Sequence, residues 1–163
     1  MPRQLIVVMG PSGCGKSSVS AALAETIGAP MLEGDDFHSD KNRAKMASGH
    51  PLTDSDRAGW LDAIWHALEA HLAPRVLLAC SALTPYVQSR LREASNRDIR
   101  FVLLDVPRDV LAERLERRTD HFMPPTLLDS QIEALKVPQD AIVIDASQSV
   151  DAIVAEVVSQ LEN

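Results

Sequence analysis

The stretch that decides the fold is the octapeptide Gly10-Pro11-Ser12-Gly13-Cys14-Gly15-Lys16-Ser17. It matches the pattern G-x-x-x-x-G-K-[ST] at every fixed position. A short apolar run at residues 5–9 precedes it, and apolar residues at helical spacing follow it over residues 16–27. A strand, a glycine-rich turn and a helix in this order predict a phosphate-binding loop, in which backbone N–H groups and the helix N-terminus surround phosphate oxygens.

The motif assigns a role to most of its residues. Lys16 would reach the β- and γ-phosphates of ATP, and the Ser17 hydroxyl would ligate Mg²⁺. The other expected contacts to the nucleotide come from Gly10, Ser12, Gly13, Cys14, Gly15 and Ser18. The alternative is a glycine-rich turn with an exposed lysine, which the strand before it and the helix after it disfavour.

Composition narrows the class of protein. The chain has 163 residues, which fits one domain of ordinary size. With 45% hydrophobic and 24% charged residues, it has enough apolar surface to fold. The formal net charge of −7 argues against a nucleic-acid binder with a broad basic face.

The same sequence gives no sign of export or of a membrane span. Its first apolar run has only five residues, and no stretch approaches the roughly 20 apolar residues that a transmembrane helix needs. Two cysteines, Cys14 and Cys80, do not make a disulfide scaffold in a chain of this length. A cytoplasmic protein without membrane or nucleic-acid partners is therefore expected.

Strand and helix patterns alternate along the rest of the chain. Further strands are predicted at residues 29–32, 76–80, 100–104 and 141–145. Helical patterns occupy residues 60–72, 86–92, 110–118, 127–135 and 153–161, whereas residues 34–57 are polar and lack a clear period. This alternation predicts an α/β fold with a five-stranded parallel sheet flanked by helices, in a single domain.

A phosphate-binding loop serves kinases, nucleotide switches and motor ATPases alike. A chain this short has no room for the further domains of a motor. A guanine-nucleotide switch would carry an N-K-x-D motif, and this sequence has none. A kinase that acts on a small molecule is the leading class, and an ATP-binding regulatory module without turnover is the alternative from another class.

Asp35 is the first candidate on the acceptor side. It follows the second predicted strand, and the carboxyl ends of strands face the ligand crevice in a doubly wound sheet. Its carboxylate could accept the proton of the acceptor hydroxyl, or hold Mg²⁺ through water. Alternatively, Asp35 only caps the next helix. Its neighbour Asp36 is the weaker candidate.

The residues around Asp35 resemble those of the gluconate kinase (gluconokinase) family. The resemblance covers roughly residues 5–145 and rests on Gly34-Asp35-Asp36-Phe37-His38, Asn42, Lys45-Met46, Gly49, Pro51-Leu52, Asp54, Asp56-Arg57, Trp60-Leu61, Ala79-Cys80-Ser81-Ala82-Leu83, His121-Phe122-Met123, Leu127-Leu128, Ser130-Gln131, Leu135 and Pro138. It implies the fold of the nucleoside-monophosphate kinases with a mobile lid, the phosphorylation of D-gluconate by ATP to 6-phospho-D-gluconate, and a homodimer. The nearest rival is another small-metabolite kinase of this fold, such as a shikimate kinase, and the block from Asn42 to Leu52 argues against it.

Gluconate is a small anion with five hydroxyl groups, so an acidic protein needs a local cation to bind it. Arg57 is the candidate for the carboxylate, since a guanidinium forms two parallel hydrogen bonds with it. An ordinary ion pair of Arg57 with Asp54 or Asp56 is the alternative. His38, Asn42, Lys45 and Ser81 are the expected partners of the hydroxyls, although His38 could be structural and Ser81 could only cap a helix.

Arginines flank the predicted lid at about residues 117–126. Arg117 or Arg118 would neutralise charge on the transferring phosphoryl group, and Arg114 and Arg118 would contact the nucleotide. The alternative is a solvated helix end, where cations suit the helix dipole. His121 is a further candidate for the substrate. The family pattern is not followed at Gly59, Thr84, Asp120 and Lys136, which affects the expected substrate preference more than the reaction type.

Overall fold

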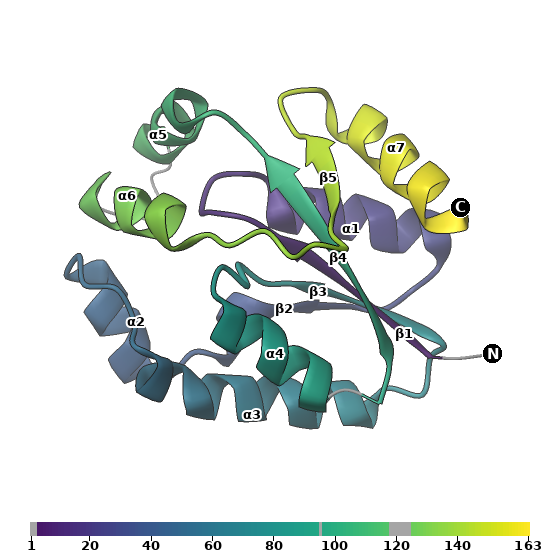
Figure 1. Cartoon of the computed structure of the whole chain (residues 1–163), viewed down its shortest axis with the longest axis horizontal. Helices are drawn as coiled ribbons and strands as arrows, with labels where there is room; N and C mark the ends of the chain where they lie inside the picture. Colours follow the sequence, from purple (N-terminus) through teal and green to yellow (C-terminus); the bar gives the residue numbers. More distant parts are fainter. Residues whose placement is uncertain (1–2, 95, 118–124) are drawn as a thin grey trace.

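The computed structural model describes residues 3–94, 96–117 and 125–163, and it confirms the predicted five-stranded sheet. The strand order is β2-β3-β1-β4-β5, and every neighbouring pair is parallel. The strands are β1 (Gln4–Met9), β2 (Met31–Glu33), β3 (Arg75–Ala79), β4 (Asp98–Asp105) and β5 (Ile142–Asp145). Because β1 lies at the centre, the loop that leaves its carboxyl end lies at the middle of the sheet edge (Figure 1).

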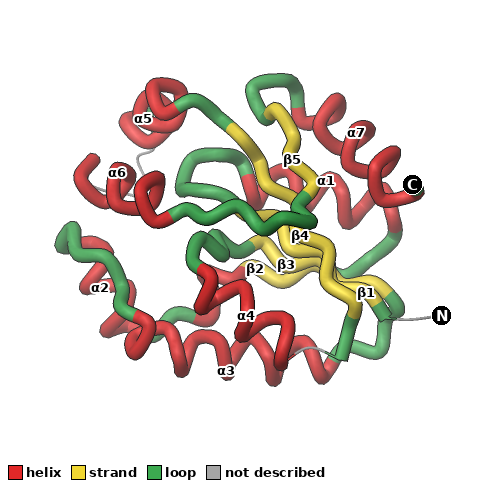
Figure 2. Tube along the Cα trace, in the orientation of Figure 1, coloured by secondary structure: helices red, strands yellow, loops and turns green. Residues whose placement is uncertain are grey.

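Helices flank this sheet, as Figures 1 and 2 show. They are α1 (Lys16–Ile27), the short 3₁₀ helix η1 (Gly34–Phe37), α2 (Asp40–Ala47), α3 (Asp54–Ala70), α4 (Pro85–Ala94), α5 (Arg108–Glu116), α6 (Pro125–Ala134) and α7 (Val150–Glu162). The predicted helix at residues 16–27 has these bounds in the structure, and it ends where Gly28 adopts a left-handed backbone with φ 67°. The polar region 34–57, which has no clear period, folds into η1, α2 and the first turn of α3.

Alternate side chains of the strands form two apolar cores, one on each face of the sheet. Ile6 and Val8 of β1 belong to the core that contains side chains from α1, α5, α6 and α7. Leu5, Val7 and Met9 belong to the core on the other face, together with side chains from α3 and α4. These five of the six β1 residues are fully buried, which is why residues 5–9 form a continuous apolar run in the sequence.

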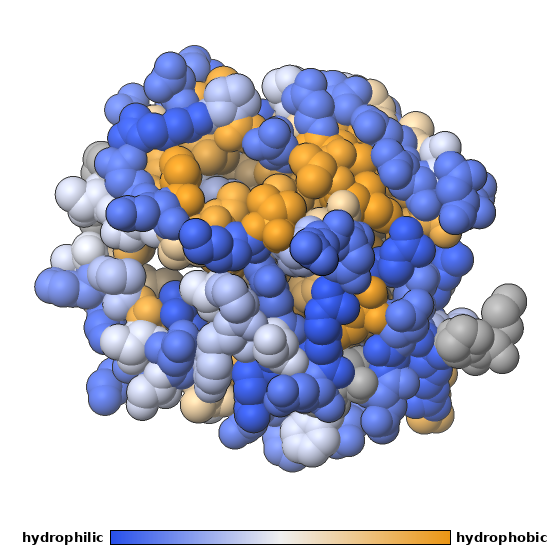
Figure 3. All heavy atoms as spheres, in the orientation of Figure 1, coloured by the Kyte–Doolittle hydropathy of each residue, from blue (hydrophilic) through white to orange (hydrophobic). Residues whose placement is uncertain are grey.

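The surface is polar over most of the face drawn in Figure 3. Apolar residues gather there around β5 and the segment after α6, where Val143 and Val137 are about half exposed at 49% and 51%. The helices in the described part of the chain include none that is long and apolar enough to cross a membrane. Cys14 and Cys80 are both free and buried.

Two glycines should respond in opposite ways to alanine. A Cβ on Gly34 would lie 2.7 Å from the carbonyl oxygen of Ala79, whereas a Cβ on Gly59 has no other atom within 4 Å. We expect Gly34→Ala to lower the free energy of unfolding by about 1–3 kcal/mol, because backbone of β3 must move. Gly59→Ala, inside α3, should raise it by up to about 1 kcal/mol.

Urea unfolding of the two variants beside the wild type measures both effects. The Gly59→Ala variant is the matched control, since it makes the same change at a site with open space. Equal stability of the two variants would contradict the close approach of η1 to β3.

Candidate active site

The phosphate loop takes a conformation that its glycines allow. Gly10, at the end of β1, has φ 144°, and a Cβ there would lie 2.8 Å from Cys14 Sγ and 3.1 Å from the carbonyl oxygen of Leu104. Gly15, the N-cap residue of α1, has φ 99°. Both positions therefore favour glycine, and they bring the loop back over the N-terminus of α1, as a phosphate-binding loop requires.

Lys16 lies across this loop. Its Nζ donates hydrogen bonds to the carbonyl oxygens of Gly10, at 2.9 Å, and of Pro11, at 3.2 Å. The backbone thus holds the ammonium group at the mouth of the phosphate loop, where it can meet an incoming phosphate.

Ser17 has a partner that the sequence reasoning missed. Its hydroxyl donates to Glu33 Oε2 at 2.5 Å, and Glu33 ends β2 two residues before Asp35. Burial raises the pKa of Glu33, while the hydrogen bond from Ser17 lowers it. The position of Glu33 at a strand end was the available signal, because the same argument identified Asp35.

A cavity beside the phosphate loop brings most of the predicted acceptor residues together. Six of the predicted site residues line it: Ser12, Lys16, Asp35, His38, Arg57 and Ser81. The other lining residues are Met46, Pro51, Leu52, Trp60, Leu127 and Gln131. The phosphate loop, η1, α3, α6 and the segment after β3 therefore meet at one place, although they are far apart in the sequence.

His38 stacks on Trp60 in the wall of this cavity. Their ring centroids are 4.5 Å apart with an angle of 9° between the planes. Trp60 is buried, and its Nε1 donates to the carbonyl oxygen of Gly34 at 2.7 Å. Burial lowers the pKa of His38, because desolvation disfavours the charged ring. Its Nδ1 is buried and has no hydrogen-bond partner among the described residues.

Arg57 lines the cavity and also lies near one of the two predicted partners. Its Nη1 is 3.5 Å from Asp54 Oδ1, and its side chain is only 19% exposed. This long ion pair at the surface contributes little stability. Both interpretations of Arg57 from the sequence, a cavity residue and a partner of Asp54, therefore have a counterpart in the structure.

Asn42 and Lys45 lie elsewhere. Asn42 is buried and donates through Nδ2 to the carbonyl oxygen of Asp56 at 2.8 Å, and Lys45 Nζ lies 2.6 Å from Asp56 Oδ2. The hydrogen bond from Lys45 lowers the pKa of Asp56. These contacts tie α2 to the start of α3, and neither residue is among those that line the described cavity. Their contact with hydroxyls of the acceptor stays a prediction. In the structure, both side chains instead contact Asp56.

The predicted lid is described only at its edges. Arg114 donates to the carbonyl oxygens of Gly13 at 3.0 Å and of Ala146 at 3.4 Å, so it braces the phosphate loop against the turn after β5. Arg117 is 77% exposed and pairs with Glu113. Arg118 and His121 lie outside the described residues, and their roles stay predictions.

Gln131, on α6, is a second residue whose contact the sequence did not reveal. Its Oε1 accepts a hydrogen bond from the backbone N–H of Ser12 at 2.8 Å. A donor of the phosphate loop is thus held by a side chain 119 residues away in the sequence. Only the packing of α6 against the loop makes this contact, so no local pattern could predict it.

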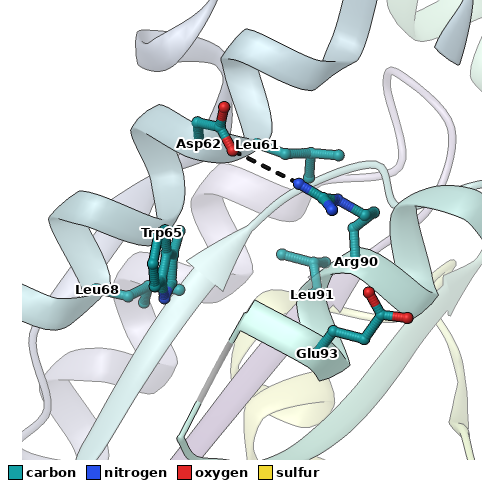
Figure 4. Close-up of a pocket in the computed structure, with 7 residues that line it drawn as sticks. All are labelled: Leu61, Asp62, Trp65, Leu68, Arg90, Leu91 and Glu93. Carbon is teal, nitrogen blue, oxygen red and sulfur yellow. Dashed lines mark ion pairs between the residues drawn. The ribbon is translucent and has the colours of Figure 1, made fainter. Parts of the chain in front are cut away.

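A second cavity, of about 250 Å³, opens between α3 and α4 and lacks this chemistry. Figure 4 shows Trp65 and Leu68 on one wall, and Arg90 extended toward Asp62, 3.5 Å away. None of the residues that line it is a predicted site residue. The smaller cavity, beside the phosphate loop, is therefore the candidate active site.

Comparisons with known proteins identify relatives of this chain. Residues 5–138 match the model of a protein family described as an AAA domain. The chain is 38% identical to the gluconokinase of Gluconobacter oxydans (strain 621H), over 98% of this chain and 92% of that protein. It is 37% identical to the thermoresistant gluconokinase of Escherichia coli (strain K12), over 97% and 93% of the two chains.

This chain belongs to the gluconokinase family. Solved structures agree, since the gluconokinase from Sinorhizobium meliloti 1021 superposes with a TM-score of 0.86 at 43% identity, over 99% of this chain and 92% of that one. The APS kinase CysC of Mycobacterium tuberculosis, in complex with AMPPNP and APS, gives a TM-score of 0.69 at 22% identity and covers 99% of both chains. The second likeness shows the shared α/β kinase fold alone.

Proposed function

We propose that this gluconokinase-family chain transfers the γ-phosphoryl group of ATP to D-gluconate and releases ADP and 6-phospho-D-gluconate. The observation that carries the proposal is the cavity in which Asp35 and Arg57 lie beside Lys16. A phosphate-binding ammonium, a carboxylate and a guanidinium in one cavity suit a phosphoryl donor and an anionic acceptor. A regulatory module without turnover would need no acceptor cavity of this kind.

The reaction assigns a step to each of these residues. The phosphate loop and Lys16 hold the β- and γ-phosphates. A hydroxyl oxygen of gluconate attacks the γ-phosphorus, the bond to the β-phosphate oxygen breaks, and ADP leaves with that electron pair. Asp35 accepts the proton of the attacking hydroxyl. Arg57 binds the carboxylate, and His38 and Ser81 contact hydroxyls further along the chain of gluconate.

The residues present also fit a magnesium ion. Magnesium is usually bound through one or two carboxylates together with substrate phosphates, and it neutralises charge that develops on them. The Ser17 hydroxyl and the carboxylates of Glu33 and Asp35 are the oxygen donors that the chain offers next to the phosphate loop. Residues 3–94, 96–117 and 125–163 contain no group of three or more His, Cys, Asp or Glu side chains that could hold a metal ion. Oxygen atoms of the substrates would therefore complete the coordination shell of the magnesium ion.

An assay of ADP release tests the proposed function. The acceptors are D-gluconate, other aldonates, shikimate and nucleoside monophosphates, each with ATP and Mg²⁺. We expect turnover that depends on D-gluconate and exceeds turnover with the other acceptors. Preference for shikimate or a nucleoside monophosphate would assign another reaction to the same cavity, and no turnover with any acceptor would contradict the proposal. A cytoplasmic location, the homodimer and the lid role of Arg118 remain predictions.

Loss of Arg57 should weaken acceptor binding more than it slows the chemistry. A contact with the carboxylate of gluconate lies away from the reacting hydroxyl, so it is equal in the ground state and the transition state. Arg57→Ala should therefore raise KM for gluconate about ten- to hundredfold, the range for a lost charge-assisted hydrogen bond, with little change in kcat. Arg57→Lys should restore only part of the affinity, because an ammonium group forms no two-bond fork.

Asp54→Asn is the matched control, because it removes the ion pair with Asp54 and keeps the guanidinium. Steady-state kinetics with gluconate and ATP varied separately should show a normal KM for gluconate in this variant. An equal rise of KM in Arg57→Ala and Asp54→Asn would mean that Arg57 acts through its ion pair and not on the acceptor.

A further inference from the structure

The loop between β3 and α4 contains the one non-glycine residue with a left-handed backbone in the described part of the chain. Ala82 has φ 45° and is 1% exposed. This conformation is unfavourable for alanine, because its Cβ crowds the following carbonyl group. The residues around Ala82 must therefore hold the loop in this form.

Three consecutive carbonyl groups of this loop accept hydrogen bonds from three different parts of the chain. The donors are the N–H of Gly10 to Ser81 at 3.3 Å, the side-chain amide of Gln88 to Ala82 at 2.9 Å, and the N–H of Lys136 to Leu83 at 2.8 Å. The phosphate loop, α4 and the segment after α6 thus each bind one residue of the loop. The central bond, at the strained residue, is the only one of the three that a side chain makes.

Gln88 is suited to this task by its burial and its two amide hydrogens. It is 8% exposed, and its Nε2 donates to the carbonyl oxygen of Lys136 at 2.7 Å as well as to that of Ala82. One amide group therefore joins the loop after β3 to the segment after α6. Without it, the buried carbonyl group of Ala82 and the partly buried one of Lys136 would each lose a donor.

We infer that Gln88 is a positioning residue for the acceptor: it holds Ala82 in the left-handed conformation and thereby fixes the neighbouring Ser81 in the cavity with Lys16 and Asp35. Gln88 is not among the residues that line the cavity, so its action passes through Ser81. The inference rests on the proposed function for the identity of the acceptor, and on the hydrogen bonds of the loop for everything else.

The first test replaces Gln88 by methionine, which has a similar length and no donor. Gln88→Met should raise KM for gluconate up to about tenfold, the effect of one misplaced hydrogen bond, and leave KM for ATP within about twofold of the wild type. Gln148→Met is the matched control. Gln148 also donates through Nε2 to a backbone carbonyl, that of Asp145 at 2.8 Å, but in the exposed turn after β5. Its KM for gluconate should stay normal.

A double-mutant cycle separates positioning from general stability. In a Ser81→Ala background there is no hydroxyl left to place, so Gln88→Met should change KM for gluconate by less than about twofold. A full additive effect in that background, or a lower Tm with an unchanged KM, would overturn the inference. Gln88→Met/Ala82→Gly is a second variant, because glycine adopts φ 45° without strain and should recover part of the lost affinity.

The wild type reports separately on the proposed function. Turnover of the wild type with gluconate supports that function whatever Gln88 does. If the wild type prefers another acceptor of the panel, the same variants are measured with that acceptor, and an unchanged KM for it would still overturn the role of Gln88.

Discussion

Replacement of Lys16 by alanine should abolish most phosphoryl transfer and leave the fold intact. The ammonium group is held at the mouth of the phosphate loop by the carbonyl oxygens of Gly10 and Pro11, and the ion pairs between described residues do not include it. We expect its charge to act mainly on the transferring phosphoryl group. We expect kcat for gluconate phosphorylation to fall by about a thousandfold, since removal of a preorganised charge of this kind removes several kcal/mol of transition-state stabilisation.

The measurement is ADP release at saturating ATP and gluconate, with Tm and circular dichroism of the same preparations. Lys41→Ala is the control, because Lys41 is an exposed lysine on α2 and is not among the residues that line the cavity. A well-folded Lys16→Ala protein with turnover within about tenfold of the wild type would contradict the assignment of residues 10–17.

The fold could be predicted where one local pattern dominates. The five strands were found because buried parallel strands are short apolar runs, and α1 because Lys16 begins it and Gly28 ends it. The helix α2 was missed because its mostly polar residues have no apolar stripe. Its position depends instead on contacts with the next helix, namely those of Asn42 and Lys45 with Asp56. The partners in these contacts are separated by 11 and 14 positions in the sequence. Helical periodicity relates residues only three or four positions apart, so it cannot predict such contacts.

The same limit applies to the site. Residues that follow the end of a strand, such as Asp35 and Ser81, were placed correctly in one cavity, because parallel strands bring their carboxyl ends to one edge. Arg57 was found through the resemblance to gluconate kinases. Gln131 and Gln88 act on loops from distant helices, and the packing of α6 and α4 decides where their amide groups lie. An amide side chain on a helix carries no signal of that kind in the sequence.

Asp35→Asn should reduce kcat about a hundredfold to ten-thousandfold, the range for loss of a general base. Asparagine has the same shape, so the backbone contacts of residue 35 with His38 and Arg43, both through its carbonyl oxygen, should persist. The variant can no longer accept the proton of the attacking hydroxyl. Because a base acts in the chemical step, KM for ATP should change by less than about threefold, in contrast to the effect of Arg57→Ala on KM for gluconate.

Asp36→Asn is the matched control, since Asp36 is the next carboxylate in η1, is exposed and is not among the residues that line the cavity. It should keep normal kcat. Single-turnover measurements with preformed enzyme–ATP complex give the rate of the chemical step directly, so a slow release of product cannot hide the effect. If Asp36→Asn lost as much activity as Asp35→Asn, the activity would depend on the total negative charge of η1 and not on Asp35 as a specific base. If neither lost activity, no carboxylate of η1 would take the proton. A capping role for Asp35 would not replace it, because Glu33 is the N-cap residue of η1 and Ser39 that of α2.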